Sequence, residues 1–366
     1  MADTVHWVGT GLSTGSGVRV LADTTDVVLY GRTEAKAAAC VERLGLTGKV
    51  TPRALDSLEP DRGDVVVSML PATEHVRLLK LCLANGSHYA NTSYVSDEIA
   101  GYAEAARDAG IVVLTEAGLD PGIDHLLAHD LVARADVAGP ATATFTSYCG
   151  GIPAVPNEFR YRFSWAPRGV LTALLSPARY IDGGETTVAE RPWEATTGYE
   201  LRGERFEAYP NRDSLPFVEQ YHLPSRWRLD RFVRGTLRLD GWLDAWAPVF
   251  AELRDPDADR ITALAADLAA RYPTTESDRD RVVLAVALWV DGDDGTRWSG
   301  EYVLDVVGDE HDSAMARLVS TPLAIGIGEV LSGAMTPGLH RAAESAEASR
   351  RWLTALRGHG IVAEYR

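Results

Sequence analysis

The sequence predicts an α/β protein, in which a doubly wound parallel sheet of Rossmann type is followed by an α+β substrate domain with a small helical subdomain. Strand-like runs alternate with helical patterns from Val5 to Thr115, as in parallel sheets. After Gly118 the pattern changes to β-rich segments interrupted by Gly, Pro and aromatic residues. At 366 residues the chain exceeds what one hydrophobic core normally supports, so two packed units are expected.

The first part of the chain reads as repeated strand and helix. Val5–Val8 suits a buried strand, a glycine turn follows, and a helix over Ser16–Ala22 leads to a second strand over Val27–Tyr30. The alternation continues with helices at Glu34–Leu44, Glu74–Asn85 and Ser96–Ala109, and with strands at Asp64–Leu70, near His88–Thr92 and at Ile111–Thr115.

The second part mixes helices and strands. A helix is expected over His125–Ala135, and β-rich stretches at 141–151 and 186–203. Helical spacing of apolar residues recurs from about Leu239 to Tyr272, and two strands at 281–292 and 297–309 flank a hairpin signal. The last predicted helices, Ser313–Ser332 and Leu339–Leu356, could pack on the first domain. We therefore expect a nucleotide domain from 1–118 and 320–366, and a substrate domain from 119–319 with a helical subdomain at about 239–275.

Composition argues against several classes of partner. The net charge of −16 disfavours nucleic acid and anionic membranes, and we see no apolar run long enough to cross a bilayer. The start from Met1 to His6 lacks the features of a secretory leader, so a cytoplasmic protein is expected. The three cysteines have no metal or disulfide spacing, and His125 and His129 share a helical face without an evident third ligand. No metal is predicted.

The first turn predicts a dinucleotide site. Gly9 permits a tight turn after the first strand, and Gly11 lets the backbone approach a pyrophosphate at the following helix. The third position of the usual glycine fingerprint is Thr14, so we expect slightly wider helix–strand packing there. Taken alone, such a turn is as often structural as functional, and its strand–turn–helix setting is what favours a cofactor.

The end of the second strand favours NADP(H) over NAD(H). An NAD site usually places Asp or Glu there, whereas this chain has Arg32 and Thr33, with Lys36 one helical turn later. Arg32 could bind a 2′-phosphate through a forked pair of hydrogen bonds, and Thr33 could donate its hydroxyl. The alternative is that Arg32 is a solvated loop residue.

Longer motifs carry a family resemblance. The chain resembles saccharopine reductase, the glutamate-forming saccharopine dehydrogenase family, in motifs that occur in the family's order over nearly the whole chain. These motifs are SMLP (68–71), NTSYVS (91–96), EAGLDPGIDH (116–125), SYCGGIP (147–153), FSWAPRGVL (163–171), YPNRDS (209–214), RGTLRLDGW (234–242) and GDEHDSAMA (308–316).

The resemblance implies a reaction and a set of site residues. The reaction is NADPH-dependent reduction of the imine of glutamate and α-aminoadipate semialdehyde, or oxidation of saccharopine. The cofactor positions implied are Gly9, Gly11, Leu12, Ser13, Thr14, Arg32, Thr33, Ser68 and Leu70. The substrate positions implied are Ser93, Tyr94, Arg212, Thr236, Leu237 and Arg238, with Asp120, Cys149 and Trp165 beside the reacting centre.

The arginines have a chemical reason as well. Saccharopine carries three carboxylates, and a chain with a net charge of −16 needs local cations to hold it. Arg212 and Arg238 could serve as clamps, with Arg168 and Arg234 as further candidates. An isolated arginine in an acidic protein more often forms a surface ion pair, but the turn and strand settings of Arg212 and Arg238 favour binding.

The residues expected near the chemistry have structural alternatives. Asp120 could stabilise an iminium or transfer its proton, or it could cap the next helix, a role that suits Asp124 better. Tyr94 could join a proton relay or only bind a carboxylate. Cys149 could join it too, or be a small packed residue. Trp165 could stack on the nicotinamide or pack in the core.

One loop departs from the family pattern. The segment between Pro153 and Phe163 has lost residues and gained Arg160 and Arg162, which leaves the amino-acid partner open. The main rival is a related enzyme acting on another N-carboxyalkyl amino acid or a polyamine conjugate. A second rival is an NADP-binding scaffold without turnover. The expected partner is a small amino-acid-derived molecule, and a homodimer is left open.

Overall fold

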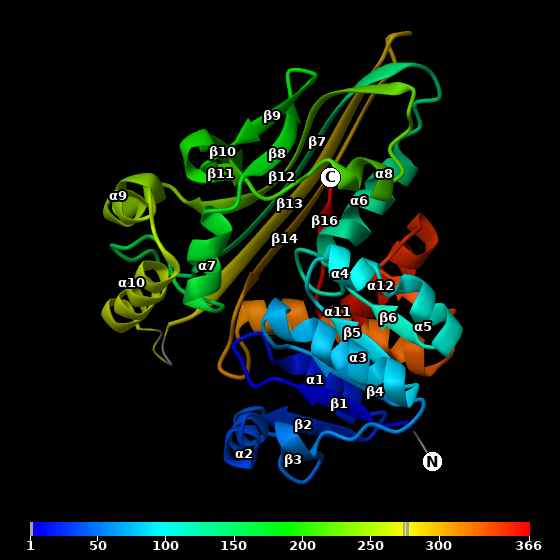
Figure 1. Cartoon of the computed structure of the whole chain (residues 1–366). Coiled ribbons are helices and arrows are strands. Elements are labelled where there is room, and N and C mark those ends of the chain that lie inside the picture. The colour runs from blue at the N-terminus through cyan, green and yellow to red at the C-terminus, as the bar shows by residue number, and fades with distance from the viewer. Residues whose placement is uncertain (1–2, 274, 276–277) are drawn as a thin grey trace. The chain divides into compact units, whose positions relative to one another are not determined.

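A computed structural model describes residues 3–273, 275 and 278–366 (Figure 1). Contacts within the chain divide it into two compact units. Unit 1 runs up to Leu126 and also contains Met315–Val362, and unit 2 comprises Leu127–Ala314 with Ala363–Arg366. Residues 1–2, used in the prediction about a leader, and residue 274 of the predicted helical subdomain lie outside the described residues.

Unit 1 is built on a parallel sheet of seven strands in the order β15-β6-β5-β4-β1-β2-β3. Chain order reverses beside β1, which lies between β2 and β4, as in the doubly wound folds that bind dinucleotides. The predicted Rossmann sheet is confirmed. The strands are β1 (Val5–Val8), β2 (Val27–Gly31), β3 (Val50–Ala54), β4 (Val65–Ser68), β5 (His88–Asn91), β6 (Val112–Leu114) and β15 (Gly338–His340).

The two edge strands of this sheet were not predicted. β3 contains Pro52 and is half exposed, so it lacks the apolar run of a central strand. At the other edge, Gly338–His340 pairs in parallel with β6, where the sequence predicted the start of a helix over Leu339–Leu356. That helix, α12 (Ala346–Gly358), begins only after Ser345, whose side chain accepts a hydrogen bond from the N–H of Ala348. A three-residue strand is too short to show periodicity.

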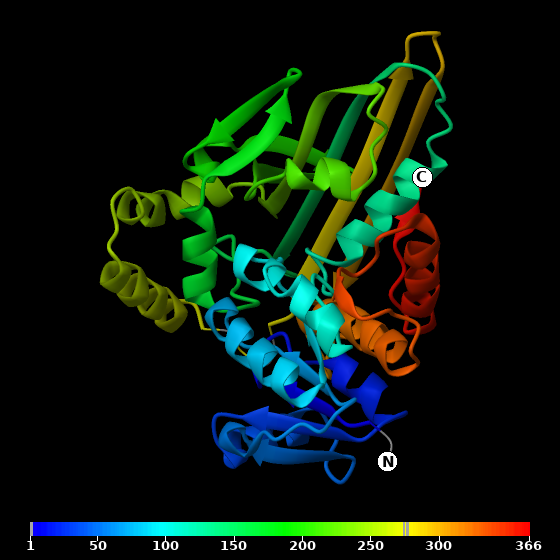
Figure 2. The ribbon, with the colours of Figure 1, turned by 45° about the vertical axis from the view of Figure 1, so that its right-hand side comes forward.

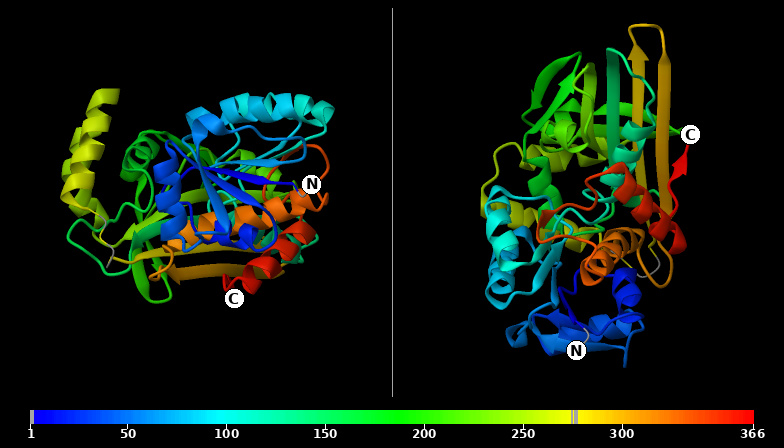
Figure 3. Two further views of the ribbon diagram at one scale, coloured as in Figure 1. Left: turned by 90° about the horizontal axis from the view of Figure 1, so that it is seen from below. Right: turned by 90° about the vertical axis from the view of Figure 1, so that its right-hand side faces the viewer.

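Helices cover both faces of the unit 1 sheet. On one side lie α3 (His75–Asn85) and α5 (Ala103–Ala109), and on the other lie α11 (Ala314–Leu331) and α12 (Figure 3, left). The predicted helix Ser96–Ala109 is wrong as a continuous element, since α4 (Asp97–Ala100) and α5 are separate. The remaining helices of this unit are α1 (Ser16–Ala22) and α2 (Glu34–Arg43).

Helix α11 contradicts the expectation that no apolar run is long enough to cross a bilayer. Among the described residues it is the one helix whose length and composition would allow it to cross a membrane, with 18 residues and a mean hydropathy of 1.3. Of this segment 61% is buried inside the protein, and a core helix of a soluble protein meets the same criterion. Within unit 1, α11 lies against Gly17 and Trp352. Its apolar residues Leu318, Leu323 and Ile327 are fully buried.

Unit 2 contains a mixed sheet with the central order β10-β11-β12-β7-β13-β14-β16 (Figure 2). β7 pairs in parallel with β12 and antiparallel with β13, and the predicted hairpin of β13 and β14 is confirmed. The bounds are β7 (Ala141–Pro153), β8 (Ala178–Asp182), β9 (Glu185–Ala189), β10 (Thr197–Leu201), β11 (Glu204–Pro210), β12 (Trp227–Leu239), β13 (Asp280–Gly292), β14 (Arg297–Val307) and β16 (Glu364–Tyr365).

The helices of unit 2 gather around an aromatic cluster. α7 packs on α10, and Arg168 of α7 donates to the hydroxyl of Thr262 on α10 over 3.2 Å. α9 and α10 lie in the range where helical spacing recurs in the sequence. Their apolar faces share a core with Phe159, Tyr161 and Phe163. α6 (Ile123–Arg134) begins in unit 1 and continues into unit 2. The helices that lie wholly in unit 2 are α7 (Pro167–Leu174), α8 (Pro216–Gln220), α9 (Trp242–Glu252) and α10 (Ala258–Arg271).

Candidate active site

The glycine turn after β1 leaves open space at one position. Gly9 has a φ of +132°, and a Cβ there would meet Met69, the residue after β4, at 2.9 Å. Gly11 has no heavy atom within 4 Å of where its Cβ would stand. Leu12 beside it is exposed and Ser13 is half buried. A diphosphate could therefore approach the backbone at Gly11.

Two residues, Thr14 and Gly17, take the place of the missing third glycine. The buried hydroxyl of Thr14 donates to the carbonyl of Gly9 over 3.1 Å and accepts from the indole N–H of Trp7 over 3.2 Å. Thr14 therefore braces the turn itself. The tight packing falls on Gly17, where a Cβ would stand 2.0 Å from the backbone oxygen of Ser320 on α11.

The end of β2 presents polar and basic groups to solvent. Arg32, Thr33 and Lys36 are all exposed there. Thr33 is the N-cap of α2, because its side chain accepts a hydrogen bond from the N–H of Lys36. Gly31 is buried, and a Cβ at this position would meet the backbone of Ala37 at 2.7 Å. The donors suit a 2′-phosphate, and the nearby carboxylate of Glu34 lies in the first turn of α2, after the strand end.

A histidine missed in the sequence joins two predicted site residues. Ser68 ends β4, and its hydroxyl lies 2.8 Å from Nδ1 of His75 at the start of α3. Nε2 of His75 lies 3.0 Å from the hydroxyl of Ser93, beyond the end of β5. Burial lowers the pKa of His75 to about 4. Leu70, two residues after Ser68, is half buried in the same segment.

Tyr94 and Asp120 come together at the same edge of the sheet. The hydroxyl of Tyr94 donates to Oδ1 of Asp120 over 2.8 Å, and both side chains are half buried. Asp124 accepts a hydrogen bond from the N–H of Gly122 over 2.7 Å, so it stabilises the turn between Asp120 and α6. A phenol and a carboxylate in contact form a pair that could hold or transfer a proton.

Glu116 holds the segment that carries Ser93 and Tyr94. Its carboxylate accepts from the N–H of Val95 over 3.0 Å, and its own N–H donates to the carbonyl of Ser93 over 3.1 Å. Burial would raise the pKa of Glu116, but the hydrogen bond and charge of His125, the Val95 N–H and the charge of Arg341 lower it to about 2. This buried anion fixes the loop after β5.

His125 takes part in this network. Its Nε2 lies 3.0 Å from Glu116 and its Nδ1 lies 3.4 Å from Asp124. His129, one turn later on α6, lies beside the rings of Tyr221 and His222. Within the described ranges there is no group of three or more His, Cys, Asp or Glu side chains that could hold a metal ion.

In unit 2, two predicted site residues and a neighbouring tyrosine form one row across the sheet. Thr236 of β12 is the register partner of Cys149 on β7 and of Tyr209 on β11. Side chains of register partners point to the same face, so these three share a face with Arg238, two residues further along β12. The side chain of Leu237 lies on the opposite face, in a core that includes Tyr148. Only the backbone of Leu237 is available to a site on the face of Thr236.

Arg238 is a buried cation enclosed by rings. Its side chain donates to the carbonyl of Leu237 and to the hydroxyl of Tyr209, each over 2.9 Å, and the residue is 6% exposed. Its guanidinium carbon lies 4.9 Å from the ring centre of Tyr161 and 5.5 Å from that of Trp242. Nε of Arg238 has no hydrogen-bond partner, and no carboxylate of the described part of the chain forms an ion pair with it. The aromatic faces offset part of its charge.

Arg212 and Arg234 lie near each other, whereas Arg168 belongs elsewhere. Arg212 is exposed in the loop after β11 with a φ of +57°. The neighbouring Asn211 donates its N–H to the carbonyl of Arg234 over 2.9 Å. The guanidinium of Arg234 covers the ring of Phe217 at 3.9 Å. Arg168 instead bonds to the helical cluster through Thr262, so the structure does not bring it to Arg238.

Trp165 and the altered loop pack on the aromatic cluster. Trp165 is half buried, and a Cβ on Gly169 would meet its ring at 2.4 Å. In the loop before it, the carbonyl of Phe159 accepts from the indole N–H of Trp246 over 3.0 Å. Nη1 of Arg162 lies 3.8 Å from Asp280. The structure therefore gives Trp165 a packing role, and its contact with a nicotinamide stays a prediction.

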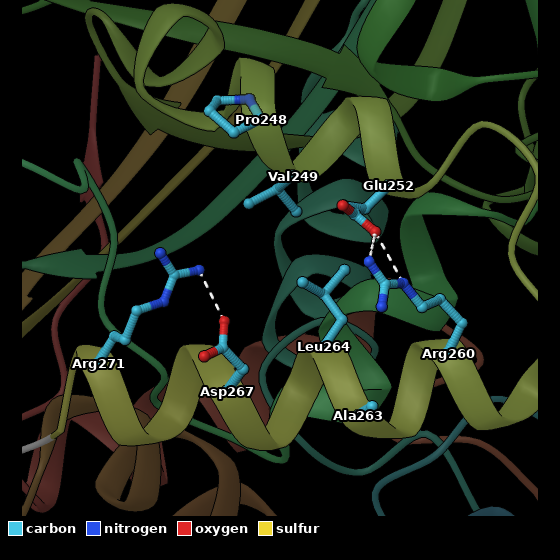
Figure 4. Close-up of a pocket in the computed structure, with 8 residues that line it drawn as sticks. All are labelled: Pro248, Val249, Glu252, Arg260, Ala263, Leu264, Asp267 and Arg271. Carbon is cyan, nitrogen blue, oxygen red and sulfur yellow. Dashed lines mark hydrogen bonds and ion pairs between the residues drawn. The ribbon is translucent and has the colours of Figure 1, made fainter.

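A pocket of about 280 Å³ lies between α9 and α10, and none of the predicted site residues lines it (Figure 4). Its charged side chains are paired: Arg260 donates to Glu252 over 2.8 Å, and Arg271 lies 2.8 Å from Asp267. Since its cations already have carboxylate partners, it does not suit an anionic substrate.

Comparison with known proteins identifies the family. Residues 5–114 match the model of the saccharopine dehydrogenase NADP binding domain, and residues 118–361 match that of the saccharopine dehydrogenase C-terminal domain. The chain belongs to the saccharopine dehydrogenase family. The resemblance drawn from the sequence motifs is thus confirmed.

Individual relatives agree with this assignment. The chain is 32% identical to the saccharopine dehydrogenase [NADP(+), L-glutamate-forming] of Pyricularia oryzae, over 77% of this chain and 79% of that protein. It is 33% identical to the mitochondrial alpha-aminoadipic semialdehyde synthase of Bos taurus over 73% of this chain, but spans only 31% of that longer protein. The apo structure of the L-Glu-forming enzyme of Saccharomyces cerevisiae aligns with a TM-score of 0.84 and 27% identity, over 100% of this chain and 99% of that one.

Family membership establishes the kind of chemistry. The protein is an NADP(H)-dependent oxidoreductase of saccharopine dehydrogenase type that acts on CH–NH donors, and its substrate is a small amino-acid-derived molecule. This confirms the cofactor prediction made from Arg32 and Thr33.

Proposed function

We propose that the protein reduces the imine of glutamate and α-aminoadipate semialdehyde to saccharopine with NADPH, or catalyses the reverse oxidation. Arg238 carries this proposal. A buried guanidinium without a carboxylate partner among the described residues is unfavourable unless a ligand supplies the anion. A substrate with three carboxylates supplies it, and the exposed Arg212 offers a second cation.

The cofactor positions suit NADP(H). The open backbone at Gly11 and the tight turn at Gly9 would accept the diphosphate, with Leu12, Ser13 and Thr14 completing the turn. Arg32 and Thr33 would hold the 2′-phosphate, and Ser68 and Leu70 would line the edge beyond β4. When bound, NADPH supplies the hydride that the imine carbon accepts.

Asp120 and Tyr94 are proposed to act on the proton at nitrogen. The carboxylate of Asp120 would stabilise the positive charge of a protonated imine, and Tyr94 would hold that carboxylate through the 2.8 Å hydrogen bond. In the reverse direction the same carboxylate would accept a proton from the substrate amine. Cys149, buried in the row with Thr236, would contact the substrate as a small neighbouring side chain.

The substrate assignment is tested by turnover. Purified protein with NADP⁺ should form NADPH in the presence of saccharopine, and should consume NADPH when glutamate and the semialdehyde are supplied together. Other N-carboxyalkyl amino acids and a carboxylated polyamine conjugate serve as competing substrates. Turnover of one of these in place of saccharopine would contradict the proposal. Tight NADPH binding with no turnover of any of them would indicate a scaffold.

The proposed setting follows the sequence predictions. Residues 1–118 and 320–366 would form the cofactor domain, and 119–319 would form the substrate domain. We propose a cytoplasmic enzyme, with neither a nucleic acid nor a membrane as partner, in which a homodimer is the oligomer to be tested. Light scattering after size-exclusion chromatography would distinguish a dimer from a monomer of 39.6 kDa.

A further inference from the structure

Two short series of hydrogen bonds lie at the ends of β4 and β5. In one, Oδ1 of Asn91 accepts from the N–H of Ser93 over 3.0 Å, and Nδ2 of Asn91 donates to the hydroxyl of Tyr89 over 3.1 Å. The other runs from Ser68 to His75 over 2.8 Å and from His75 to Ser93 over 3.0 Å.

The two hydrogen bonds of His75 are linked through its ring. A neutral imidazole carries a proton on one ring nitrogen only, so one nitrogen donates and the other accepts. When Ser68 donates to Nδ1, Nε2 must donate to Ser93.

The imidazole is neutral in the folded protein. His75 is 2% exposed, and burial lowers its pKa to about 4. With both ring nitrogens bonded to serine hydroxyls, it has one donor and one acceptor to offer. With the proton on Nε2, the hydroxyl of Ser93 accepts from His75 and keeps its own proton for a group on the other side. Ser93 is half buried at the carboxyl edge of the sheet, where open α/β folds bind ligands.

We propose that His75 is a positioning residue that keeps the Ser93 hydroxyl as a hydrogen-bond donor to a substrate carboxylate and couples it to Ser68. The proposal rests on the proposed function for the class of substrate. The role requires an acceptor facing Ser68 and a donor facing Ser93, which the shape of the ring alone does not provide. Variants that keep or remove one hydrogen bond can therefore separate the role from packing.

Three substitutions make this comparison. His75→Gln retains an acceptor and a donor at the end of its side chain. His75→Asn is shorter and can reach Ser68 but not Ser93. His75→Leu fills similar space with neither. His359→Asn, at an exposed histidine of the same unit, is the control for replacing a histidine by an amide.

The expected result is a selective loss of substrate binding. His75→Asn should raise the substrate KM about ten- to a hundredfold, the effect of one hydrogen bond to a charged group, while the NADPH Kd from fluorescence titration changes less than about threefold. His75→Gln should recover the KM to within about fivefold of wild type. In a Ser93→Ala background, His75→Asn should add less than a twofold further change, because its effect acts through Ser93.

Several outcomes would overturn the proposal. These are a His75→Gln variant as impaired as His75→Leu, a His75→Asn change in NADPH affinity without a change in KM, or full additivity with Ser93→Ala. The KM measurements use whichever conjugate the wild type turns over. They can therefore be made even if the wild type does not turn over saccharopine. The tautomer is tested without turnover by nitrogen NMR of histidine-labelled protein, with His75→Asn identifying the signal. A proton on Nδ1, or a charged ring at neutral pH, would contradict it.

Discussion

The hydroxyl of Tyr94 lies 2.8 Å from Oδ1 of Asp120, as a donor to that carboxylate. Tyr94 follows β5 and Asp120 precedes α6, so the contact joins two segments that are 26 residues apart in sequence. Their meeting at the carboxyl edge of a parallel sheet places a proton donor and a proton acceptor where such sheets bind ligands.

Asp120→Ala should lower kcat more than it raises KM. Removal of the carboxylate takes away stabilisation of the charged imine, and a group of this kind contributes about a hundredfold or more. Steady-state kinetics of Asp120→Ala, Tyr94→Phe and the double variant measure the coupling, which should be sub-additive. Asp97→Asn, at an exposed carboxylate of α4, is the control. An unchanged kcat in Asp120→Ala would remove this residue from the chemistry.

Arg32→Ala should weaken NADPH binding and leave NADH binding nearly unchanged. Only NADPH carries the 2′-phosphate, and loss of a charge-assisted hydrogen bond should raise its Kd about ten- to a hundredfold. Lys49→Ala is the control, because it removes a positive charge from the opposite, amino end of the sheet, just before β3. An equal rise in the Kd of both cofactors, measured by fluorescence titration, would show that Arg32 does not bind the 2′-phosphate.

Gly17→Ala and Gly11→Ala should affect different properties. A Cβ at Gly17 would clash with the backbone of Ser320, so this variant should lose about 2 kcal/mol or more of unfolding free energy. A Cβ at Gly11 meets no protein atom within 4 Å, so stability should be preserved while the NADPH Kd rises. Urea unfolding and cofactor titration of both variants test this. A stable Gly17→Ala protein, or an unaltered Kd in Gly11→Ala, would contradict the assignment.

Glu116 should make the protein lose stability in acid. Its pKa is lowered from 4.5 to about 2 in the folded state, so the unfolded chain binds the proton more tightly. The stabilisation is therefore complete above about pH 4.5 and is lost as the pH falls towards 2, by about 3 kcal/mol in total. Unfolding midpoints between pH 3 and 6, with Glu116→Gln as comparison, measure the effect. The unfolding midpoint of Glu116→Gln should fall less steeply with decreasing pH than that of the wild type. The same pH dependence in both proteins would refute the role of Glu116.

Arg238→Met should separate stability from binding. Replacing a buried cation that lacks a carboxylate partner by an apolar side chain should leave the unfolding free energy unchanged or raise it. The substrate KM should rise at least tenfold, since the clamp is lost. Arg238→Lys should not restore binding, because lysine lacks the planar fork. A normal KM in Arg238→Met would place the carboxylate site elsewhere.

Local pattern predicted the elements that have long, regular signals. The first βαβ unit and the β13–β14 hairpin follow from alternation and turn residues, which act over a few neighbours in sequence. The edge strands β3 and β15 escaped prediction because one contains Pro52 and the other has three residues. The strand setting of Arg238 was predicted, but the first half of β12 was missed because it carries Arg228, Asp230 and Arg231, although it lies between two strands of the sheet.

The sequence by itself determined the fold class, the cofactor turn, the basic group that favours NADP(H) and, through its motifs, the family. These depend on residues that are close in the chain or on strings of unusual composition. Tertiary structure alone decided that His75 joins Ser68 to Ser93, and that Cys149, Thr236 and Tyr209 share one row. It also placed the close approach of α1 on Ser320, which is 303 residues from Gly17. Such contacts depend on strand order, register and burial, which arise only when distant segments pack together.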